Sequence, residues 1–290
     1  MSWDLSGRTA LITGAASGIG AALAGALAQR GMRLGLIDRD ADRLAGVAER
    51  LPGAVMEVAD VCDRGALDTA IEDVVERLGR IDVAVANAGI ATGGPARMVG
   101  PDAFEDTIEV NLLGVWRTAR SALPYVVERR GYLLLVASAA AIVPAPGLAA
   151  YSASKAGMEA FGRALRAELL PHGVGVGVAY YLFLDTPMVR DGERIAGFAR
   201  TKGDLPGPLA RTYPLEPAIE TTVRGIERRA RRIAYPRFLH PLMAVRGLID
   251  NPLTDRLASR SMLEMEAAFT EEAQRVGPDA AARPPRRMVT

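Results

Sequence analysis

The chain is poor in the residues from which metal centres and disulfide frameworks are built. Its 290 residues include one cysteine, Cys62, and two histidines, His172 and His240. A single cysteine excludes an intramolecular disulfide and any multi-cysteine zinc or iron–sulfur site. The two histidines have no second ligand in view, so we expect no metal site.

The chain also lacks an excess of charge of one sign. Its 35 basic residues face 34 acidic ones, which gives a formal net charge of +1. Binding to a nucleic-acid backbone relies on a surplus of positive charge, so we expect no nucleic-acid partner. The arginines between Arg224 and Arg237 are interpreted as a solvated helix face.

No uninterrupted hydrophobic run of membrane-spanning character is present. The longest segment without a charge, between Arg130 and Lys155, contains Pro144, Pro146 and Gly147. These breakers predict a strand, a loop and the start of a helix, so we expect no integral membrane span and a cytoplasmic protein. An alternative stays open in which the apolar stretch Phe238–Ile249 holds the protein at a membrane surface.

Short apolar runs alternate with helical patterns along most of the chain. The runs predict strands at Thr9–Thr13, Arg33–Ile37, Ala54–Val58, Val83–Ala86, Tyr132–Ala137, Gly175–Tyr181 and Arg231–Tyr235. Helices are expected at Ile19–Arg30, Leu44–Leu51, Leu67–Leu78, Phe104–Glu128, Ser152–Leu170, Thr221–Arg232 and Asp255–Gln274. Strands without inside/outside alternation, separated by helices, predict a parallel sheet covered on both faces. The fold class is therefore α/β, a Rossmann-type doubly wound sheet in three layers with a C-terminal helical extension.

Composition suggests one domain followed by an extension. Residues 1–245 are expected to form a dinucleotide-binding catalytic domain, in which the Pro- and Gly-rich segment 186–217 is a lid or substrate loop. Residues 246–276 are expected to form the helical extension. Residues 277–290, dominated by Pro, Ala and Arg, are expected to be a disordered tail.

A glycine cluster follows the first predicted strand. Gly14, Gly18 and Gly20 have the spacing Gly-x-x-x-Gly-x-Gly, between a strand and a helix, where backbone N–H groups can approach a pyrophosphate. Asp38 closes the second strand and is placed to accept the adenosine ribose hydroxyls, which favours NAD over NADP. Arg39 beside it leaves an NADP-preferring enzyme as the alternative.

A second constellation joins Tyr151 and Lys155. Their spacing of four puts both side chains on one helix face. A tyrosine that serves as a base near pH 7 needs its pKa lowered by about 3 units, and a nearby lysine cation acts in that direction. The chain has two lysines in all, Lys155 and Lys202, so a chance pairing is improbable.

Taken together and in order, these motifs resemble those of the short-chain dehydrogenase/reductase family over about residues 5–190. The matching motifs are Thr13-Gly14 with Gly18-Ile19-Gly20, Asp60-Val61, Asn87-Ala88-Gly89, Asn111, Ser138, and Tyr151 with Lys155. The resemblance implies a catalytic set of Asn111, Ser138, Tyr151 and Lys155. The implied cofactor contacts are Gly14, Ser17, Gly18, Ile19, Gly20, Asp38, Arg39, Asp60, Val61, Asn87, Ala88, Gly89, Tyr151, Lys155 and Thr186.

The resemblance also assigns roles. It implies that Tyr151 exchanges a proton with the substrate oxygen while a hydride moves to or from the nicotinamide. Ser138 would hold the same oxygen, Lys155 would lower the pKa of Tyr151 and bind the nicotinamide ribose, and Asn111 would anchor a relay water.

One stretch departs from the family pattern. After the strand Gly175–Tyr181 the family usually has Pro-Gly, where this chain has Tyr181 and Leu182, although Thr186 is retained. We interpret the departure as a pocket remodelled for a particular substrate. The alternative is a nucleotide-binding protein of the same fold with weakened catalysis.

The expected function is interconversion of a fairly apolar secondary alcohol and its ketone with NAD. Apolar residues are expected around the mouth of the site: Ala91, Ile142, Val143, Leu182, Phe183 and Met188. The resemblance further implies a homodimer or homotetramer built from the long helices around Phe104–Glu128 and Ser152–Leu170.

Overall fold

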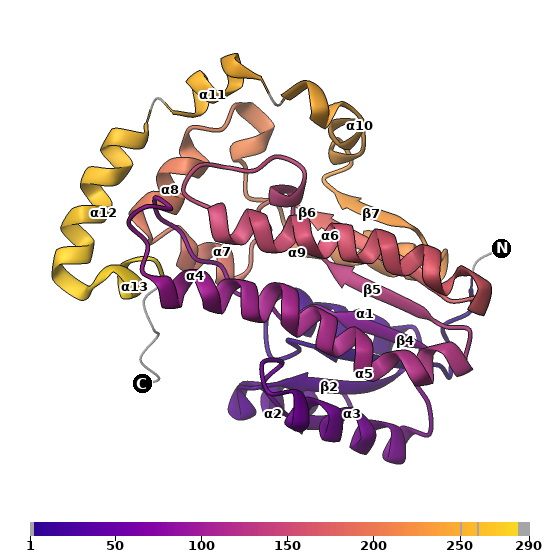
Figure 1. Cartoon of the computed structure of the whole chain (residues 1–290). Coiled ribbons are helices and arrows are strands. Elements are labelled where there is room, and N and C mark those ends of the chain that lie inside the picture. Colours follow the sequence, from indigo (N-terminus) through magenta and orange to yellow (C-terminus); the bar gives the residue numbers. More distant parts are fainter. Residues whose placement is uncertain (1–2, 250, 260, 284–290) are drawn as a thin grey trace.

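The computed structural model describes residues 3–249, 251–259 and 261–283. Seven parallel strands form one sheet in the order β3-β2-β1-β4-β5-β6-β7 (Figure 1). The strands are β1 Thr9–Thr13, β2 Arg33–Asp38, β3 Val55–Val58, β4 Val83–Ala86, β5 Tyr132–Val136, β6 Gly175–Tyr181 and β7 Arg232–Tyr235. The predicted doubly wound α/β fold is confirmed.

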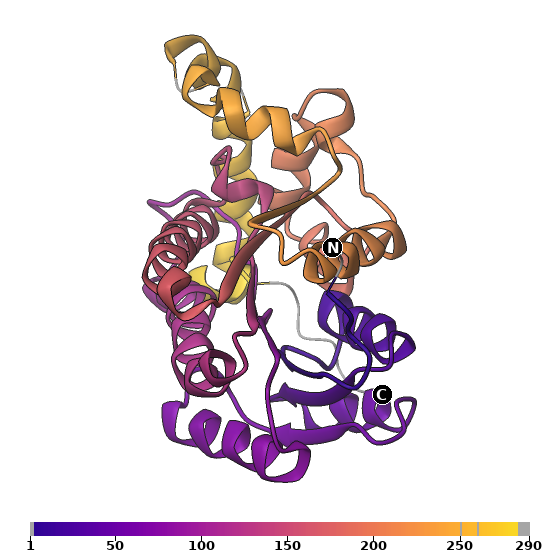
Figure 2. The same cartoon turned by 90° about the vertical axis from the view of Figure 1, so that its right-hand side faces the viewer.

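Helices cover both faces of the sheet and make three layers (Figure 2). Residues of α3, α5 and α6 share one core cluster, and residues of α1, α2 and α9 share the other. The bounds are α1 Gly18–Gln29, α2 Ala41–Ala48, α3 Arg64–Leu78, α5 Gly114–Glu128, α6 Ala149–Leu169 and α9 Leu215–Glu227. Aspartates begin two of them: Asp40 caps α2 through the Arg43 amide, and Asp63 caps α3 through the Ala66 amide.

The central strands are buried on both faces. Every residue of β1, β4 and β5 is buried, whereas the edge strands β3 and β7 each carry an exposed residue. Burial on both faces explains why the sequence of these strands shows no alternation.

Two predicted helices differ from the structure. The expected helix Phe104–Glu128 is α4 Pro101–Ile108, a π-helical turn η1 Glu109–Leu113 and then α5. The helix expected at Thr221–Arg232 is α9, which begins at Leu215 and ends at Glu227. The prediction placed its start too late because Pro217 reads as a breaker, although the first turn of a helix tolerates proline.

The segment 186–217 is more ordered than a plain loop. It contains α7 Pro187–Gly192, α8 Ala196–Gly203 and the short turn η4 Gly207–Ala210. It connects β6 to α9 and stands at the carboxyl end of the sheet.

Helices also follow the last strand, as predicted. They are α10 Leu239–Ile249, α11 Pro252–Ala258, α12 Met262–Val276 and α13 Pro278–Ala281. The single helix expected at Asp255–Gln274 is therefore wrong. It is interrupted between Ala258, where α11 ends, and Met262, where α12 begins. The Ser259 hydroxyl donates to the Arg256 carbonyl oxygen at this end of α11.

The predicted disorder from Gly277 onward is wrong for the part that the structure describes. Pro278–Ala281 is helical, and Ala281 and Ala282 are buried against α4 and α12. Residues 284–290 lie outside the described residues. Among the described helices, none is both long and apolar enough to cross a membrane.

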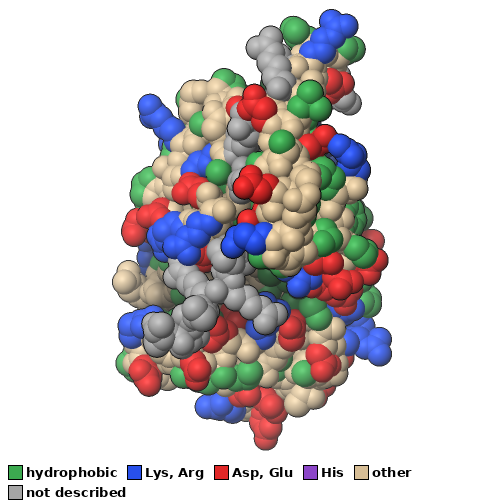
Figure 3. All heavy atoms as spheres, turned by 90° about the vertical axis from the view of Figure 1, so that its left-hand side faces the viewer, with side chains coloured by type: hydrophobic (Ala, Val, Ile, Leu, Met, Phe, Trp, Pro, Cys, Tyr) green, Lys and Arg blue, Asp and Glu red, His purple; other side chains and the backbone are tan. Residues whose placement is uncertain are grey.

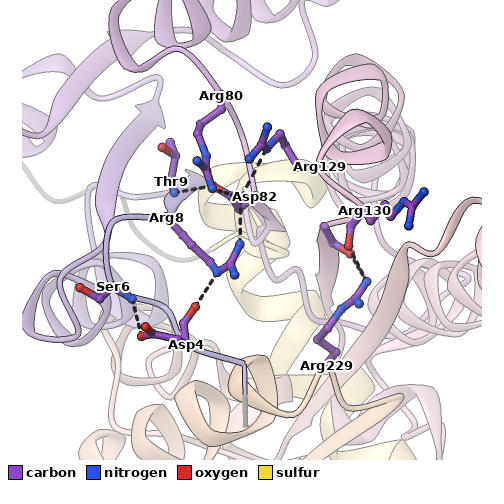
Figure 4. Close-up of polar contacts among 10 residues, drawn as sticks. Asp4, Ser6, Arg8, Thr9, Arg80, Asp82, Arg129, Arg130 and Arg229 are labelled. Carbon is purple, nitrogen blue, oxygen red and sulfur yellow. Dashed lines mark hydrogen bonds and ion pairs between the residues drawn. The ribbon is translucent and has the colours of Figure 1, made fainter. Parts of the chain in front are cut away.

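The buried carboxylate of Asp82 joins three strands at their amino ends, on the side of the sheet opposite the carboxyl ends of the strands (Figure 4). Asp82 immediately precedes β4, and its side chain is fully buried. Its Oδ2 accepts from the Thr9 amide at 2.9 Å, while its backbone carbonyl accepts from the Tyr132 amide at 2.8 Å. The same residue therefore holds the starts of β1 and β5 to β4.

Three arginines surround this carboxylate. Arg80 binds it through two nitrogens at 2.6 and 2.7 Å, Arg8 lies at 3.3 Å and Arg129 at 3.8 Å. Burial by itself would raise the pKa of Asp82, but the hydrogen bonds from Arg80 and Thr9 and the charges of Arg80 and Arg8 hold it below its ordinary value.

We predict that Asp82→Asn lowers the free energy of unfolding by about 1–3 kcal/mol at pH 7, because the partly exposed Arg80 and Arg8 lose their charged partner. The folded-state pKa is lowered, so this contribution is complete above the unfolded value of 3.8 and is lost as the pH falls through the folded pKa. Urea unfolding at several pH values measures the free energy of unfolding of variant and wild type. The difference between the two proteins should become smaller below pH 3.8.

The matched control is Asp68→Asn, whose partner Arg120 lies at 3.4 Å in an exposed pair. It is expected to cost less than about 1 kcal/mol. An equal loss in the two variants would contradict the proposed importance of Asp82.

Candidate functional site

A cavity of about 660 Å³ lies at the carboxyl ends of the strands. It opens between β1 and β4, where the order of the strands in the sheet reverses. Doubly wound sheets bind their ligands at this point. Fifteen of the predicted site residues line it: Gly14, Ser17, Gly18, Ile19, Asp38, Arg39, Asp60, Val61, Asn87, Ala88, Gly89, Ser138, Tyr151, Lys155 and Thr186. Gly20 and Asn111 lie behind its wall.

The glycine-rich turn between β1 and α1 has no room for a side chain at Gly14 or Gly20. A Cβ on Gly20 would lie 2.1 Å from the Gly14 carbonyl oxygen. Asn87 fastens the turn from β4, because its Nδ2 donates to the carbonyl oxygens of Thr13 and Gly14 at 3.0 Å each.

The amino end of α1 faces the same cavity. Ser17 caps the helix without a side-chain hydrogen bond, and its first turn contains no acidic residue. The first N–H groups of a helix lack intrahelical partners and carry partial positive charge. Free donors beside this glycine-rich turn fit the pyrophosphate of a dinucleotide.

Three aspartates and two arginines line the wall beyond this turn. Asp38 accepts from the Ala16 amide at 2.9 Å and from the Asp40 amide at 3.0 Å. Arg39 pairs with Asp60 at 3.4 Å, and Arg43 pairs with Asp40 at 3.2 Å. Each arginine is therefore next to an acidic partner, whereas Asp38 is bound only by backbone N–H groups.

Asp60 is held in its charged form. Burial would raise the pKa of Asp60, but the hydrogen bond from the Cys62 amide at 2.9 Å and the charge of Arg39 lower it further than burial raises it. The carboxylate thus remains available as a hydrogen-bond acceptor at the cavity wall.

Tyr151, Lys155 and Ser138 come together at the other end of the cavity. Tyr151 and Lys155 are one turn apart on α6, and the Lys155 Nζ lies 5.6 Å from the centre of the Tyr151 ring. Ser138 follows β5 and lines the cavity with Tyr151. Its Oγ accepts from the Ala140 amide at 3.2 Å and donates to the Tyr181 carbonyl oxygen at 3.5 Å. Lys155 also donates to the carbonyl oxygen of Val136 at 3.0 Å, which fixes α6 to the end of β5.

Asn111 lies in the π-helical turn η1 and is fully buried. Its Nδ2 donates to the Ile90 carbonyl oxygen at 2.9 Å and to Ser154 Oγ at 3.1 Å, and its Oδ1 accepts from the Ile90 amide at 2.8 Å. The side chain thus joins the segment after β4 to α6, and both its N–H groups are used within the protein.

Burial shapes the charge states of the pair on α6. Burial raises the pKa of Tyr151 above its ordinary value of 10.0, and the Ser138 hydroxyl offsets this only in part. This direction is opposite to the lowering expected from a neighbouring lysine. The reason is that burial of Tyr151 itself has the larger effect on its pKa. Burial also lowers the pKa of the neighbouring Lys155 from 10.5 to about 8.

The wall beyond Tyr151 is mainly apolar. Five of the six residues expected at the mouth line the cavity, but Ile142 does not, because it is buried in the core. Phe183 and Phe198 add an aromatic corner, with ring centres 5.6 Å apart in an edge-to-face arrangement.

The second lysine of the chain supports this corner. Lys202 lies 5.3 Å from the centre of the Phe183 ring and is bonded to Glu193 and Thr212. It therefore ties α8 to both ends of the segment 186–217.

Tyr181 and Leu182, where the chain departs from the family pattern, take part in the pairing of β6 with β7. Tyr181 is in register with Tyr235, and the Leu182 amide donates to the Tyr235 carbonyl oxygen at 3.1 Å. The Tyr181 ring is buried and its hydroxyl bonds Thr222 Oγ1 at 2.5 Å. Thr186 still caps the next helix, α7, and lies beside Gly18.

Sequence reasoning missed cavity residues that come from far along the chain. The C-terminal helices contribute Leu242, Thr254, Ser261 and Met265 to the wall. The helical spacing of Met262, Met265 and Phe269 indicated a buried face, but it could not show what that face covers. Arg43 was also missed, although its position one turn into α2 follows from the cap at Asp40.

Known proteins resemble the chain over most of its length. The short chain dehydrogenase family model matches residues 8–194. A 3-oxoacyl-(acyl-carrier-protein) reductase of Thermotoga maritima is 38% identical over 212 residues, which cover 71% of this chain and 85% of that protein. A (-)-trans-carveol dehydrogenase of Rhodococcus erythropolis is 35% identical over 204 residues, covering 64% of this chain and 74% of that protein.

A solved structure also resembles the chain. A short chain dehydrogenase from Mycobacterium paratuberculosis bound to NAD superposes with a TM-score of 0.72 at 27% identity. The match covers 80% of this chain and 97% of the other.

We predict that Lys155 titrates with a midpoint of about 8, because burial disfavours its charged form. Protein labelled with ¹³C at lysine Cε has two lysine signals, since Lys155 and Lys202 are its only lysines. Following both signals from pH 6 to 11 measures the pKa directly. Lys155→Met removes one signal and assigns it, and a Lys155 midpoint at or above 10.5 would contradict the burial argument.

Proposed function

The chain belongs to the short-chain dehydrogenase/reductase family, and on that premise we propose that it interconverts a fairly apolar secondary alcohol and its ketone with NAD. One observation carries the proposal: Ser138, Tyr151 and Lys155 meet in a single cavity that has a helix amino end beside a glycine-rich turn and an apolar wall. A bound nicotinamide would take up or supply the hydride.

The residues of the chain handle the substrate oxygen and its proton. In reduction, the ketone carbon gains a hydride and Tyr151 donates its hydroxyl proton to the oxygen, which gives the neutral alcohol. Oxidation reverses both transfers. The raised pKa keeps Tyr151 protonated near neutral pH, the state that donation to a ketone requires.

Ser138 and Lys155 prepare this proton transfer. The Ser138 hydroxyl, which lines the same cavity as Tyr151, orients the substrate oxygen toward it. The Lys155 ammonium stabilises negative charge that develops on Tyr151 when it gives up its proton, and binds the nicotinamide ribose. Asn111 is a positioning residue, because its hydrogen bonds hold the Ile90 backbone against α6.

The apolar wall supports a substrate without charge. Leu182, Phe183, Met188 and Phe198 border the cavity near Tyr151. One relative carries the name of a dehydrogenase for carveol, a cyclic terpenoid alcohol, which fits a wall of this kind.

The charges near Asp38 support NAD. Arg39 and Arg43 are each paired with an acid, so neither offers an unpaired cation for a 2′-phosphate. Asp38, bound only by backbone amides, repels such a phosphate and accepts from ribose hydroxyls.

We further propose that the chain forms a homodimer or homotetramer through α4, η1 and α5. Phe104 on α4, Leu113 at the end of η1 and Trp116 on α5 are 36%, 38% and 40% exposed. Large apolar side chains on neighbouring helices are typical of protein interfaces.

We expect Tyr151→Phe to lower turnover of secondary alcohols by at least about 10²-fold while NADH affinity stays within twofold, since only the proton donor is lost. NADH fluorescence titration measures binding, and NADH formation with 2-alkanols and carveol measures turnover. Tyr125→Phe, which changes a tyrosine of α5 that does not line the cavity, serves as the control. Near-normal turnover by Tyr151→Phe would remove Tyr151 from its role, and activity confined to small charged hydroxy acids would overturn the substrate class.

Asp38→Asn is expected to shift cofactor preference toward NADP. Asp38 accepts the Ala16 and Asp40 N–H groups on its two separate oxygens, and the single amide oxygen of Asn can accept from one of them. The change therefore removes the negative charge together with one backbone contact. The ratio of the NADP to the NAD dissociation constant should fall at least about tenfold. Arg39→Ala provides the comparison and should leave NAD affinity unchanged. An unchanged ratio in Asp38→Asn, or a wild-type protein that prefers NADP, would refute the choice of NAD.

A further inference from the structure

The described residues of 252–283, which we call the strap, run from the far side of the cavity to α4 (Figure 1). The strap contains α11, α12 and α13, and it lies wholly beyond the segment that the family model matches. Its course brings residues close together that are far apart in sequence.

The strap forms part of the cavity wall. Thr254, Ser261 and Met265 all line the cavity. Met265 is 1% exposed, and α12 packs against α8 of the segment 186–217. None of these three side chains carries a charge, so this part of the wall suits an uncharged ligand surface.

Asp279 fastens the far end of the strap to α4. Its Oδ1 accepts from the Ala103 amide at 2.7 Å, in the first turn of a helix whose own cap residue, Gly100, offers no side chain. A Cβ on Gly100 would lie 2.3 Å from the Asp279 carboxylate. The strap thus supplies the missing cap, and its negative charge lies at the positive end of the helix.

Further contacts reinforce this attachment. Glu266 accepts from Arg97 at 2.6 and 3.0 Å, Arg283 donates to Asp106 at 2.8 Å, and the Gly93 amide donates to the Ala282 carbonyl oxygen at 2.9 Å.

The apolar side of the strap is equally well seated. The Phe269 ring is 2% exposed and fills the space where Gly94 has no side chain.

Figure 3, which faces this side of the molecule, shows acidic and basic side chains interspersed rather than separated into patches of one sign.

We propose that the strap is the substrate-specificity element of the site, in which Met265 limits the length of the apolar part of the substrate and Asp279 holds the strap closed. The inference rests on the proposed function, because it takes an apolar alcohol or ketone as the ligand. Met265 suits this role, since an unbranched thioether fills a gap without adding charge. Asp279 is a positioning residue that acts through the strap.

The test uses a ladder of 2-alkanones from four to twelve carbons, bound to the full-length protein with saturating NAD, which cannot reduce a ketone, and measured by calorimetry. Affinity should rise about fourfold per methylene until the wall is reached. Met265→Ala should move that limit to chains about two carbons longer, and Met265→Phe should shorten it. Met265→Leu, which keeps the volume, and Leu263→Ala, which changes a residue 80% exposed on the same helix, should leave it unchanged.

Asp279 is tested by hydrogen exchange. Asp279→Ala should speed hydrogen exchange of the Ala103 amide by roughly fivefold or more. It should also make the alkanone length at which affinity stops rising less sharp. Asp279→Asn retains an acceptor, so its exchange rate and its length limit should equal those of the wild type. Glu272→Ala, which removes an exposed carboxylate of α12 paired only with Arg275, should change neither.

The outcomes separate the two proposals. If the Met265 variants shift the alkanone length limit but the protein shows no turnover, the specificity role of Met265 is retained and the proposed catalysis is overturned. An unmoved limit in folded Met265→Ala and Met265→Phe proteins, or unchanged Ala103 exchange in Asp279→Ala, would overturn the inference. If the wild-type protein binds no alkanone, both the substrate class and the role of Met265 fail, while exchange at Ala103 still decides whether the strap is fastened.

Discussion

The catalytic end of the cavity depends on one buried amide that must satisfy its hydrogen bonds inside the protein. Asn111 does so by bonding the Ile90 backbone on both sides and Ser154 on α6. A buried amide without these partners would be costly, so the segment after β4, the π-helical turn and α6 have one mutually consistent arrangement. A π-helical turn is rare and often marks a functional site, and here it places this side chain in the interior.

The two ends of the cavity use opposite electrostatic means. Near Asp38 and Asp60 the wall keeps full charges that are paired or bound by amides, which suits a polar nucleotide. Near Tyr151 the wall is apolar, and burial moves the pKa of Lys155 down and that of Tyr151 up. Burial thus favours the uncharged form of both groups, which keeps the Tyr151 proton available for donation.

Most of the fold and the motifs of the site could be predicted from sequence because they depend on local spacing. Buried strands, the glycine turn and the pair Tyr151 and Lys155 are each encoded within a few residues. The π-helical turn could not be predicted, because it changes the hydrogen-bond register of a helix without changing its apolar periodicity. The direction of the Tyr151 pKa was mispredicted because burial depends on the whole surrounding wall. Asp279 could not be predicted because its partner on α4 is distant in sequence, with 176 positions between Ala103 and Asp279. Met265 could not be predicted because the wall that it joins is built from separate segments of the chain, among them α8.

The position of α12 and α13 after the whole sheet has a consequence for biogenesis. During synthesis the chain emerges from its amino end, so β1 to β7 and the glycine turn can assemble before Met265 and Asp279 exist. The nucleotide-facing half of the cavity is therefore able to form first, and the wall that contains Met265 is completed last. A nascent chain would gain the ability to hold a dinucleotide before it gains the ability to choose among alcohols.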